Sequence, residues 1–266
     1  MNVRNFDWRF FLVLLAGAAL GLIAIVPYSL ALQDQAALAT VTERAGMPMG
    51  LLITLQLLPQ LLFFAIAIWI GLVLANAVGL GLPILQEWLH GKSIGADLRC
   101  MLPISVSLGV VLGLLIIALD ALVFQPALVR ALGANALAGE SAVMPEAWKG
   151  FLASFYGAIN EEILLRLFLM SLVVWLGRFI SRKADGSPTQ AVLWTANIVA
   201  AVLFGLGHLP ATAALVPLTP LVVTRALVLN GLGGLGFGYL YMKHGLESAM
   251  ISHFSADIIL HVLIAI

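Results

Sequence analysis

Long apolar segments, separated by short polar stretches, follow one another along almost the whole chain. A segment of about 20 mostly apolar residues is the length that crosses a bilayer as an α-helix. The pattern predicts about eight such helices, near residues 10–32, 50–78, 101–124, 148–176, 191–209, 211–229, 231–243 and 247–265. We therefore expect an all-α fold, a polytopic bundle of membrane helices.

The composition supports this interpretation and limits the partners. Hydrophobic residues make up 62% of the 266 residues and charged residues only 10%, whereas a soluble domain has about 25% charged residues. Lys plus Arg equals Asp plus Glu at 13 each, so no overall charge indicates nucleic acid. The expected partners are membrane lipid and a membrane-associated peptide or protein. A single cysteine, Cys100, excludes an intramolecular disulfide framework and any multi-cysteine metal site.

The distribution of Lys and Arg indicates an orientation. With the N-terminus inside, one side would collect Arg4, Arg9, Lys92, Arg99, Arg178, Arg182 and Lys183, and the other Arg44, Arg130, Lys149 and Lys243. Cytoplasmic loops carry the excess of Lys and Arg, so this favours a cytoplasmic N-terminus. We expect an integral protein of a bacterial inner membrane. The stretch 125–149 is expected to be an interfacial connector, with a substrate gate as the alternative.

Three charged side chains interrupt the apolar run near residue 160. Glu161, Glu162 and Arg166 fall within six residues, although one charge near the bilayer centre costs about 3 kcal/mol on insertion scales. On an α-helix Glu162 and Arg166 share a face, with the Glu N-terminal, which suits an ion pair. Glu161 would then need a partner on another helix. The alternative is a purely structural charge cluster that ties helices together.

Two further segments carry ionisable side chains in apolar surroundings. Phe204-Gly-Leu-Gly-His208 ends one predicted span, and the last span carries His253 and Asp257, four residues apart and therefore on one face, with His261 one turn further. A lone histidine at a helix end is more often a packing or interfacial residue. Together, however, a carboxylate and an imidazole in a water-accessible cavity can activate water, and a second imidazole can donate to an oxyanion. This is a set of groups for hydrolysing a peptide bond without a serine or cysteine nucleophile.

The order of these motifs resembles that of a known family. Glu161-Glu162-Ile-Leu-Leu-Arg166, Phe204-Gly-Leu-Gly-His208 and His253-Phe-Ser-Ala-Asp257 resemble the motifs of CPBP intramembrane proteases, which include the type II CAAX prenyl endopeptidases and bacteriocin-immunity (abortive infection) relatives. The resemblance covers roughly residues 145 to 261. It implies N-terminal membrane spans over 1–144 and a CAAX-protease-like catalytic core over 145–266, in one integrated membrane domain.

The resemblance also implies roles for the residues. Glu161 with His208 would activate water, and His253 with the residue at 257 would stabilise the oxyanion, while Glu162, Arg166 and Phe204 would support the site. The eukaryotic proteases typically have Asn where this chain has Asp257. An ionised Asp257 would repel an oxyanion, so it would have to be protonated, orient His253 or bind a metal.

A metal and other functions remain open from the sequence. Members of the family are often called metalloproteases, and Glu161, His208, His253 and Asp257 could coordinate zinc. No His-Glu-x-x-His helix is present, and a metal-free glutamate-dependent mechanism with the same residues is favoured. The alternatives to an intramembrane endopeptidase are a proton-coupled transporter and a non-catalytic immunity or scaffold protein. Prenylated substrates are not expected in a bacterial membrane, so another membrane-associated peptide is the expected substrate.

Overall fold

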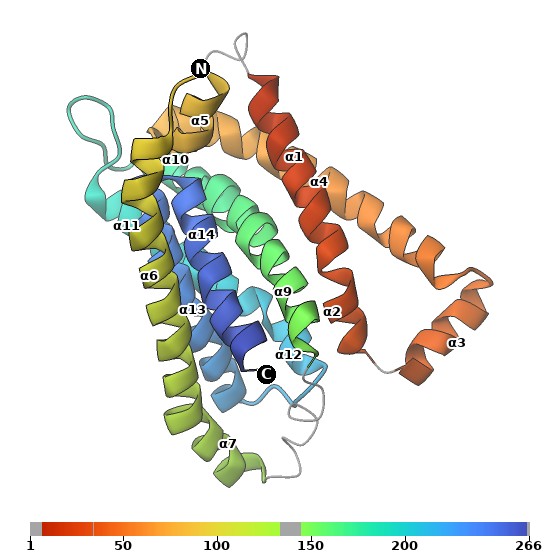
Figure 1. The fold of residues 1–266 in the computed structure, drawn as a ribbon. Coiled ribbons are helices and arrows are strands. Elements are labelled where there is room, and N and C mark those ends of the chain that lie inside the picture. Colours follow the sequence, from red (N-terminus) through yellow and green to blue (C-terminus); the bar gives the residue numbers. More distant parts are fainter. Residues whose placement is uncertain (1–6, 34, 134–144, 265–266) are drawn as a thin grey trace.

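The protein is a bundle of helices packed side by side (Figure 1). A computed structural model describes residues 7–33, 35–133 and 145–264, and within these ranges the chain is helical without a β-strand. The N-terminal half contains α1 (Trp8–Ala24), α2 (Val26–Ala31), α3 (Gln35–Ala45), α4 (Met49–Val78), α5 (Pro83–Leu89), α6 (Gly95–Leu119), the π-helical segment η2 (Asp120–Phe124) and α7 (Gln125–Leu132). The expected all-α bundle is confirmed.

The C-terminal half begins with a long continuous helix. This helix consists of α9 (Ala147–Phe155), the π-helical segments η3 (Tyr156–Glu161) and η4 (Ile163–Met170), and α10 (Ser171–Gly177). It is followed by α11 (Gln190–Gly207), α12 (Leu209–Ala213), α13 (Pro220–His244), α14 (Leu246–Asp257) and the π-helical segment η5 (Ile258–Leu263).

Most of these helices can cross a membrane. Among the described residues, six helices are long and apolar enough to do so: 8–31, 49–78, 95–132, 190–213, 220–244 and 246–263. The helix over 147–177 is also long enough. Its charged residues Lys149, Glu161, Glu162 and Arg166 are too closely spaced to leave an apolar stretch of 18 residues with two charges or fewer, and in this it differs from the six. The chain is therefore an integral membrane protein.

The expected spans 211–229 and 231–243 are wrong. One helix, α13, runs from Pro220 to His244 and begins after the turn that follows α12. Its glycines do not break it; they bring α11 close. A Cβ on Gly234 would come within 2.9 Å of the Cα of Ala201, and one on Gly238 would overlap the side chain of Asn197. The glycine-rich segment therefore serves close packing of α13 against α11.

The stretch between Gln125 and Lys149 lies only partly within the described residues. The first eight residues form α7, which continues from α6 and η2, and residues 134–144 lie outside the described ranges. The interfacial connector and the substrate gate expected for this stretch therefore stay predictions.

Both halves of the chain contribute to one hydrophobic core. Buried side chains of α1 and α4, such as Leu22 and Ile68, belong to the same cluster as Leu167 in η4 and Ala256 in α14. Asn160 adds a polar link, because its Nδ2 donates to the carbonyl oxygen of Ala18 at 3.1 Å. The N-terminal spans thus pack directly against the helix that carries Glu161 and Glu162.

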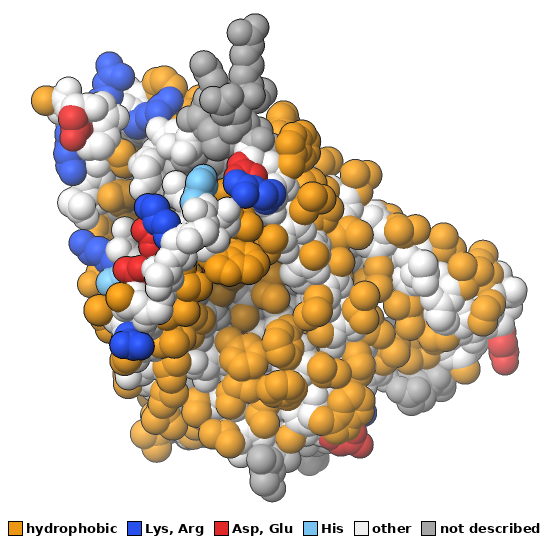
Figure 2. Space-filling view, turned by 45° about the horizontal axis from the view of Figure 1, so that its top comes forward, with side chains coloured by type: hydrophobic (Ala, Val, Ile, Leu, Met, Phe, Trp, Pro, Cys, Tyr) orange, Lys and Arg blue, Asp and Glu red, His pale blue; other side chains and the backbone are white. Residues whose placement is uncertain are grey.

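Positive charge gathers at one end of the bundle. Figure 2 shows Lys and Arg side chains over the end that carries α5 and the loop between α10 and α11, while the rest of the face in view is largely hydrophobic. Because α13 is a single helix, Lys243 lies at this end, where Leu246 N donates to the Gly81 carbonyl oxygen, and Arg225 lies at the other. The expected placement of Lys243 opposite Lys92 is therefore wrong.

Candidate active site in the bundle

Glu161 and Glu162 lie in a part of the long helix that is wider than an α-helix. Segments η3 and η4 have π-helical hydrogen bonding, which is rare and is found mostly at functional sites. The expected α-helical geometry is wrong here in detail. The predicted partnership is still present, because Arg166 Nε lies 3.2 Å from Glu162 Oε2 and both side chains are fully buried.

Glu162 also has a partner that the sequence did not predict. Its Oε1 accepts a hydrogen bond of 2.8 Å from Nδ1 of His253 in α14. Glu162 therefore binds Arg166 with one oxygen and His253 with the other. Its carboxylate joins two helices that are about 90 residues apart in the sequence.

Arg166 is enclosed by aromatic rings and backbone. Its Nη2 donates to the carbonyl oxygen of Gly234 at 2.9 Å, and its guanidinium carbon lies 5.4 Å from the ring centre of Phe204 and 5.6 Å from that of Phe237. The 3.2 Å contact with Glu162 lacks the alignment of a hydrogen bond. The charge of Arg166 is thus stabilised by an ion pair, one hydrogen bond and two ring faces.

His253 is fixed by Phe237 and Glu162, and its remaining nitrogen faces two carboxylates. Phe237 stacks on its ring with a centroid distance of 4.4 Å, and Nδ1 donates to Glu162. Its Nε2 lies 3.6 Å from Asp257 Oδ1 and 3.7 Å from Glu161 Oε2. The prediction that His253 and Asp257 share a face is confirmed.

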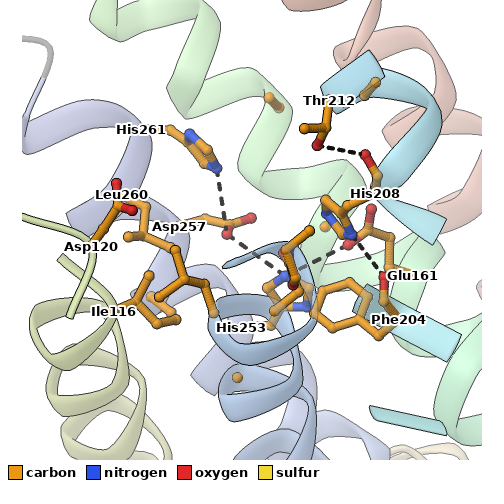
Figure 3. Close-up of a pocket in the computed structure, with 18 of the residues that line it drawn as sticks. Ile116, Asp120, Glu161, Phe204, His208, Thr212, His253, Asp257, Leu260 and His261 are labelled. Atoms are coloured by element: carbon orange, nitrogen blue, oxygen red, sulfur yellow. Dashed lines mark hydrogen bonds and ion pairs between the residues drawn. The ribbon is translucent and has the colours of Figure 1, made fainter. Parts of the chain in front are cut away.

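Asp257 lies between two imidazoles and close to the long helix. Its Oδ1 is 4.0 Å from Nε2 of His261, one turn further along, and Figure 3 shows a row of contacts from His261 through Asp257 and His253 to Glu161. A Cβ on Gly157 would overlap Asp257 Oδ2 and lie 3.1 Å from His253 Nε2. Glycine at this position allows the long helix to approach the acid and the imidazole closely.

His208 reaches the same cavity from the end of α11. Its Nδ1 lies 2.8 Å from the carbonyl oxygen of Phe204, which can only accept, so Nδ1 carries a proton and Nε2 of a neutral ring is unprotonated. The described residues include no hydrogen bond or ion pair that joins His208 to Glu161 or His253. The predicted convergence is therefore a shared cavity rather than direct bonding.

All four predicted catalytic residues line one cavity of about 700 Å³. Most of its wall is apolar, and it extends over the half of the bundle away from the positively charged end, between α2, η2, α12, α13 and η5. Glu162 and Arg166 are buried behind this wall. A cavity with an apolar wall and a few convergent polar groups is the usual form of an active or binding site.

Sequence reasoning missed a second ion pair in the cavity wall. Asp120 and Arg225 form a bidentate pair, with Nε to Oδ1 at 2.6 Å and Nη2 to Oδ2 at 2.8 Å, and Gln125 donates to Asp120 Oδ2 at 3.3 Å. Each is an ionisable residue within an apolar helix. The rule that singled out Glu161 would also have predicted that these two need partners.

Within the described ranges, no group of three or more His, Cys, Asp and Glu side chains could hold a metal ion. Nδ1 of His253 is already bound to Glu162.

A comparison with protein families places this site in context. Residues 143–259 match the family model described as type II CAAX prenyl endopeptidase Rce1-like. The C-terminal part of the chain is therefore similar to the CAAX protease family. The match includes Glu161, His208, His253 and Asp257, and it ends before His261. No curated protein and no solved structure matched the chain.

Proposed function

We propose that the protein is an intramembrane endopeptidase in which Glu161 activates water. The observation that carries the proposal is the convergence of Glu161, His208, His253 and Asp257 on one cavity inside an apolar bundle. The family match supports a protease at the level of the family. The wall of the cavity keeps water scarce, which strengthens the electrostatic effect of each polar group.

The reaction uses the groups in sequence. The Glu161 carboxylate takes a proton from water while the water oxygen forms a bond to the peptide carbonyl carbon, whose oxygen becomes an oxyanion. When the C–N bond breaks, Glu161 returns the proton to the leaving nitrogen. The products are a carboxylic acid and an amine. His208, with Nε2 unprotonated in the neutral ring, is placed on the same cavity to hold the water by accepting its second hydrogen.

His253 is assigned to the oxyanion. Its Nδ1–H is bound to Glu162, so only Nε2 can donate into the cavity, and a proton there is favoured by the carboxylates of Glu161 and Asp257. An ionised Asp257 would repel an oxyanion directly. Its position beside Nε2 supports the second of the three roles left open by the sequence, that of orienting His253.

The substrate is proposed to be a membrane-associated peptide that enters from the end of the bundle opposite the positive charge. By the positive-inside rule, the excess of Lys and Arg at the α5 end supports a cytoplasmic location for that end and for the N-terminus. The cavity would then be reached from the other side. We propose that this membrane is a bacterial inner membrane.

The single cysteine tests this orientation. Cys100 is exposed near the start of α6, at the positively charged end. A membrane-impermeant maleimide should leave Cys100 unlabelled in intact bacterial cells and label it after permeabilisation. A Cys100→Ala/Arg130→Cys protein should show the reverse, because Arg130 is exposed in the last turn of α7. Labelling of Cys100 in intact cells would overturn the orientation.

The catalytic assignment is tested with Glu161→Gln. The purified protein in nanodiscs is given a farnesylated peptide with a CAAX end and a matched palmitoylated peptide, and membranes from cells with each variant are compared by proteomics. Loss of the base should lower the cleavage rate by at least about 100-fold. Glu87→Gln, on the exposed part of α5, is the matched control. A Glu161→Gln protein that cleaves like wild type would refute the assignment, and parallel assays with a zinc chelator test metal dependence.

A further inference from the structure

Two polar side chains outside the matched residues extend the row of contacts beyond Asp257. Tyr28 comes from α2 and His261 from η5, and both line the cavity. The hydroxyl of Tyr28 lies 3.4 Å from Nδ1 of His261, and Nε2 of His261 faces Asp257 Oδ1 at 4.0 Å. We propose that Tyr28 and His261 are positioning residues that hold Asp257 beside His253, an inference that rests on the proposed function.

The chemistry of the partners sets the direction of these contacts. A carboxylate favours an N–H, so the proton of a neutral His261 belongs on Nε2, toward Asp257. Nδ1 of His261 then has a lone pair, and the Tyr28 hydroxyl is placed to donate to it. Tyr28 therefore selects the tautomer of His261 that faces Asp257 with a donor.

The same oxygen of Asp257 meets His253 from the other side. Oδ1 lies 3.6 Å from His253 Nε2, so it is held between two imidazole nitrogens. His253 is fixed in turn by Glu162, and His261 by Tyr28. The row thus has a partner at each end, and Asp257 lies within it, beside the nitrogen assigned to the oxyanion.

Local structure supports this arrangement. The π-helical segment η5 begins directly after Asp257, and the ring of His261 packs edge-on against Tyr28 with a centroid distance of 5.7 Å. The side chain of His261 is 39% exposed and that of Asp257 only 11%. His261, with Tyr28 behind it, therefore lies between the largely buried acid and the open part of the cavity. The N-terminal spans thereby contribute a residue to a site whose motifs all lie in the C-terminal half.

Tyr28→Phe and His261→Ala should each lower kcat by about 10-fold and leave KM within about 2-fold, because they act on a residue that orients a catalytic group. The probe is whichever of the farnesylated and palmitoylated peptides wild type cleaves. His261→Gln should restore much of the rate, since its amide can donate to Asp257 and accept from Tyr28. Tyr239→Phe and His244→Ala, both outside the cavity lining, are the matched controls. Unchanged kcat in Tyr28→Phe and His261→Ala would overturn the proposal.

A double-mutant cycle separates positioning from a general structural effect. In an Asp257→Asn background the carboxylate that His261 faces is gone, so adding His261→Ala should lower kcat by less than about 2-fold. An equal loss in both backgrounds would mean that His261 does not act through Asp257.

Nitrogen NMR of the protein labelled at histidine gives a readout that needs no substrate. The chain has five histidines, so each resonance can be assigned by single substitutions. Tyr28→Phe should change the tautomer signals of His261 and leave those of His90 and His244 unchanged. If His261 does not respond, the proposal fails even when proteolysis is established; if it responds and no peptide is cleaved, the proposed function fails and the contact stands.

Discussion

Two acid–arginine pairs lie within the membrane bundle, and they differ in what surrounds them. Glu162 and Arg166 are neighbours on one helix and fully buried, whereas Asp120 and Arg225 join two helices and are 22% and 16% exposed to the cavity. The buried pair meets at 3.2 Å without hydrogen-bond alignment, and the cavity pair is bidentate, with its shorter contact at 2.6 Å. Short, aligned contacts therefore do not mark the pair on which the site depends.

The difference lies in the third partners. Glu162 also accepts from His253, and Arg166 lies between Phe204 and Phe237, which themselves contact the His253 ring. Removing either charge would leave the other one buried without its ionic partner. Asp120 and Arg225 face the cavity, so water can replace a lost partner. The buried pair should thus determine folding and activity, and the cavity pair should adjust the shape of the wall.

The largest effect is expected for Arg166→Met. It leaves the Glu162 carboxylate buried with only His253 as partner, and breaking such a pair costs about 3–5 kcal/mol. We expect a clear loss of thermal stability in detergent, measured by intrinsic fluorescence, together with loss of proteolysis. Wild-type stability of this variant would show that the fold does not depend on the buried ion pair.

A double variant separates the two consequences. Glu162→Gln/Arg166→Met removes both charges, so much of the lost stability should return. Activity should not return, because the carboxylate that fixes Nδ1 of His253 is missing. Recovery of activity along with stability would assign Glu162 a structural role alone.

A smaller effect is expected for Asp120→Asn and Arg225→Gln. The partly exposed pair should contribute about 1 kcal/mol or less, and cleavage should fall by no more than a few-fold. The double variant should be no less stable and no less active than the more impaired of the two single variants, since both changes remove the same contact. Thermal unfolding and cleavage rates of all three variants check this, and a loss as large as that of Arg166→Met would end the distinction between the pairs.

The local parts of the site were predictable. The spacing of Glu162 and Arg166 gave their ion pair, and the spacing of His253 and Asp257 gave their common face, because residues four apart meet on any helix of nearly this pitch. The order of the three motifs indicated a family whose model matches nearly the same residues. The polar groups were found because each is costly in an apolar helix.

The boundaries of the helices were less predictable. A glycine-rich run at Gly231 resembled a break between two spans, yet the backbone continues through it as α13 because its glycines pack against α11. Composition cannot distinguish a glycine that ends a helix from one that admits a neighbour. Because of that single difference, Lys243 lies at the end opposite to the one expected.

The sequence by itself determined that this is a helical membrane bundle. It also determined which side chains are so unfavourable in the membrane that they need partners, and which of them share a helix face. Only the tertiary structure decided that Glu162 binds His253, that Asp120 meets Arg225, and that Tyr28 reaches His261. The physical reason is that apolar residues cover nearly all faces of these helices. Hydrophobicity therefore fixes their place in the membrane, and close packing sets how each is rotated toward its neighbours.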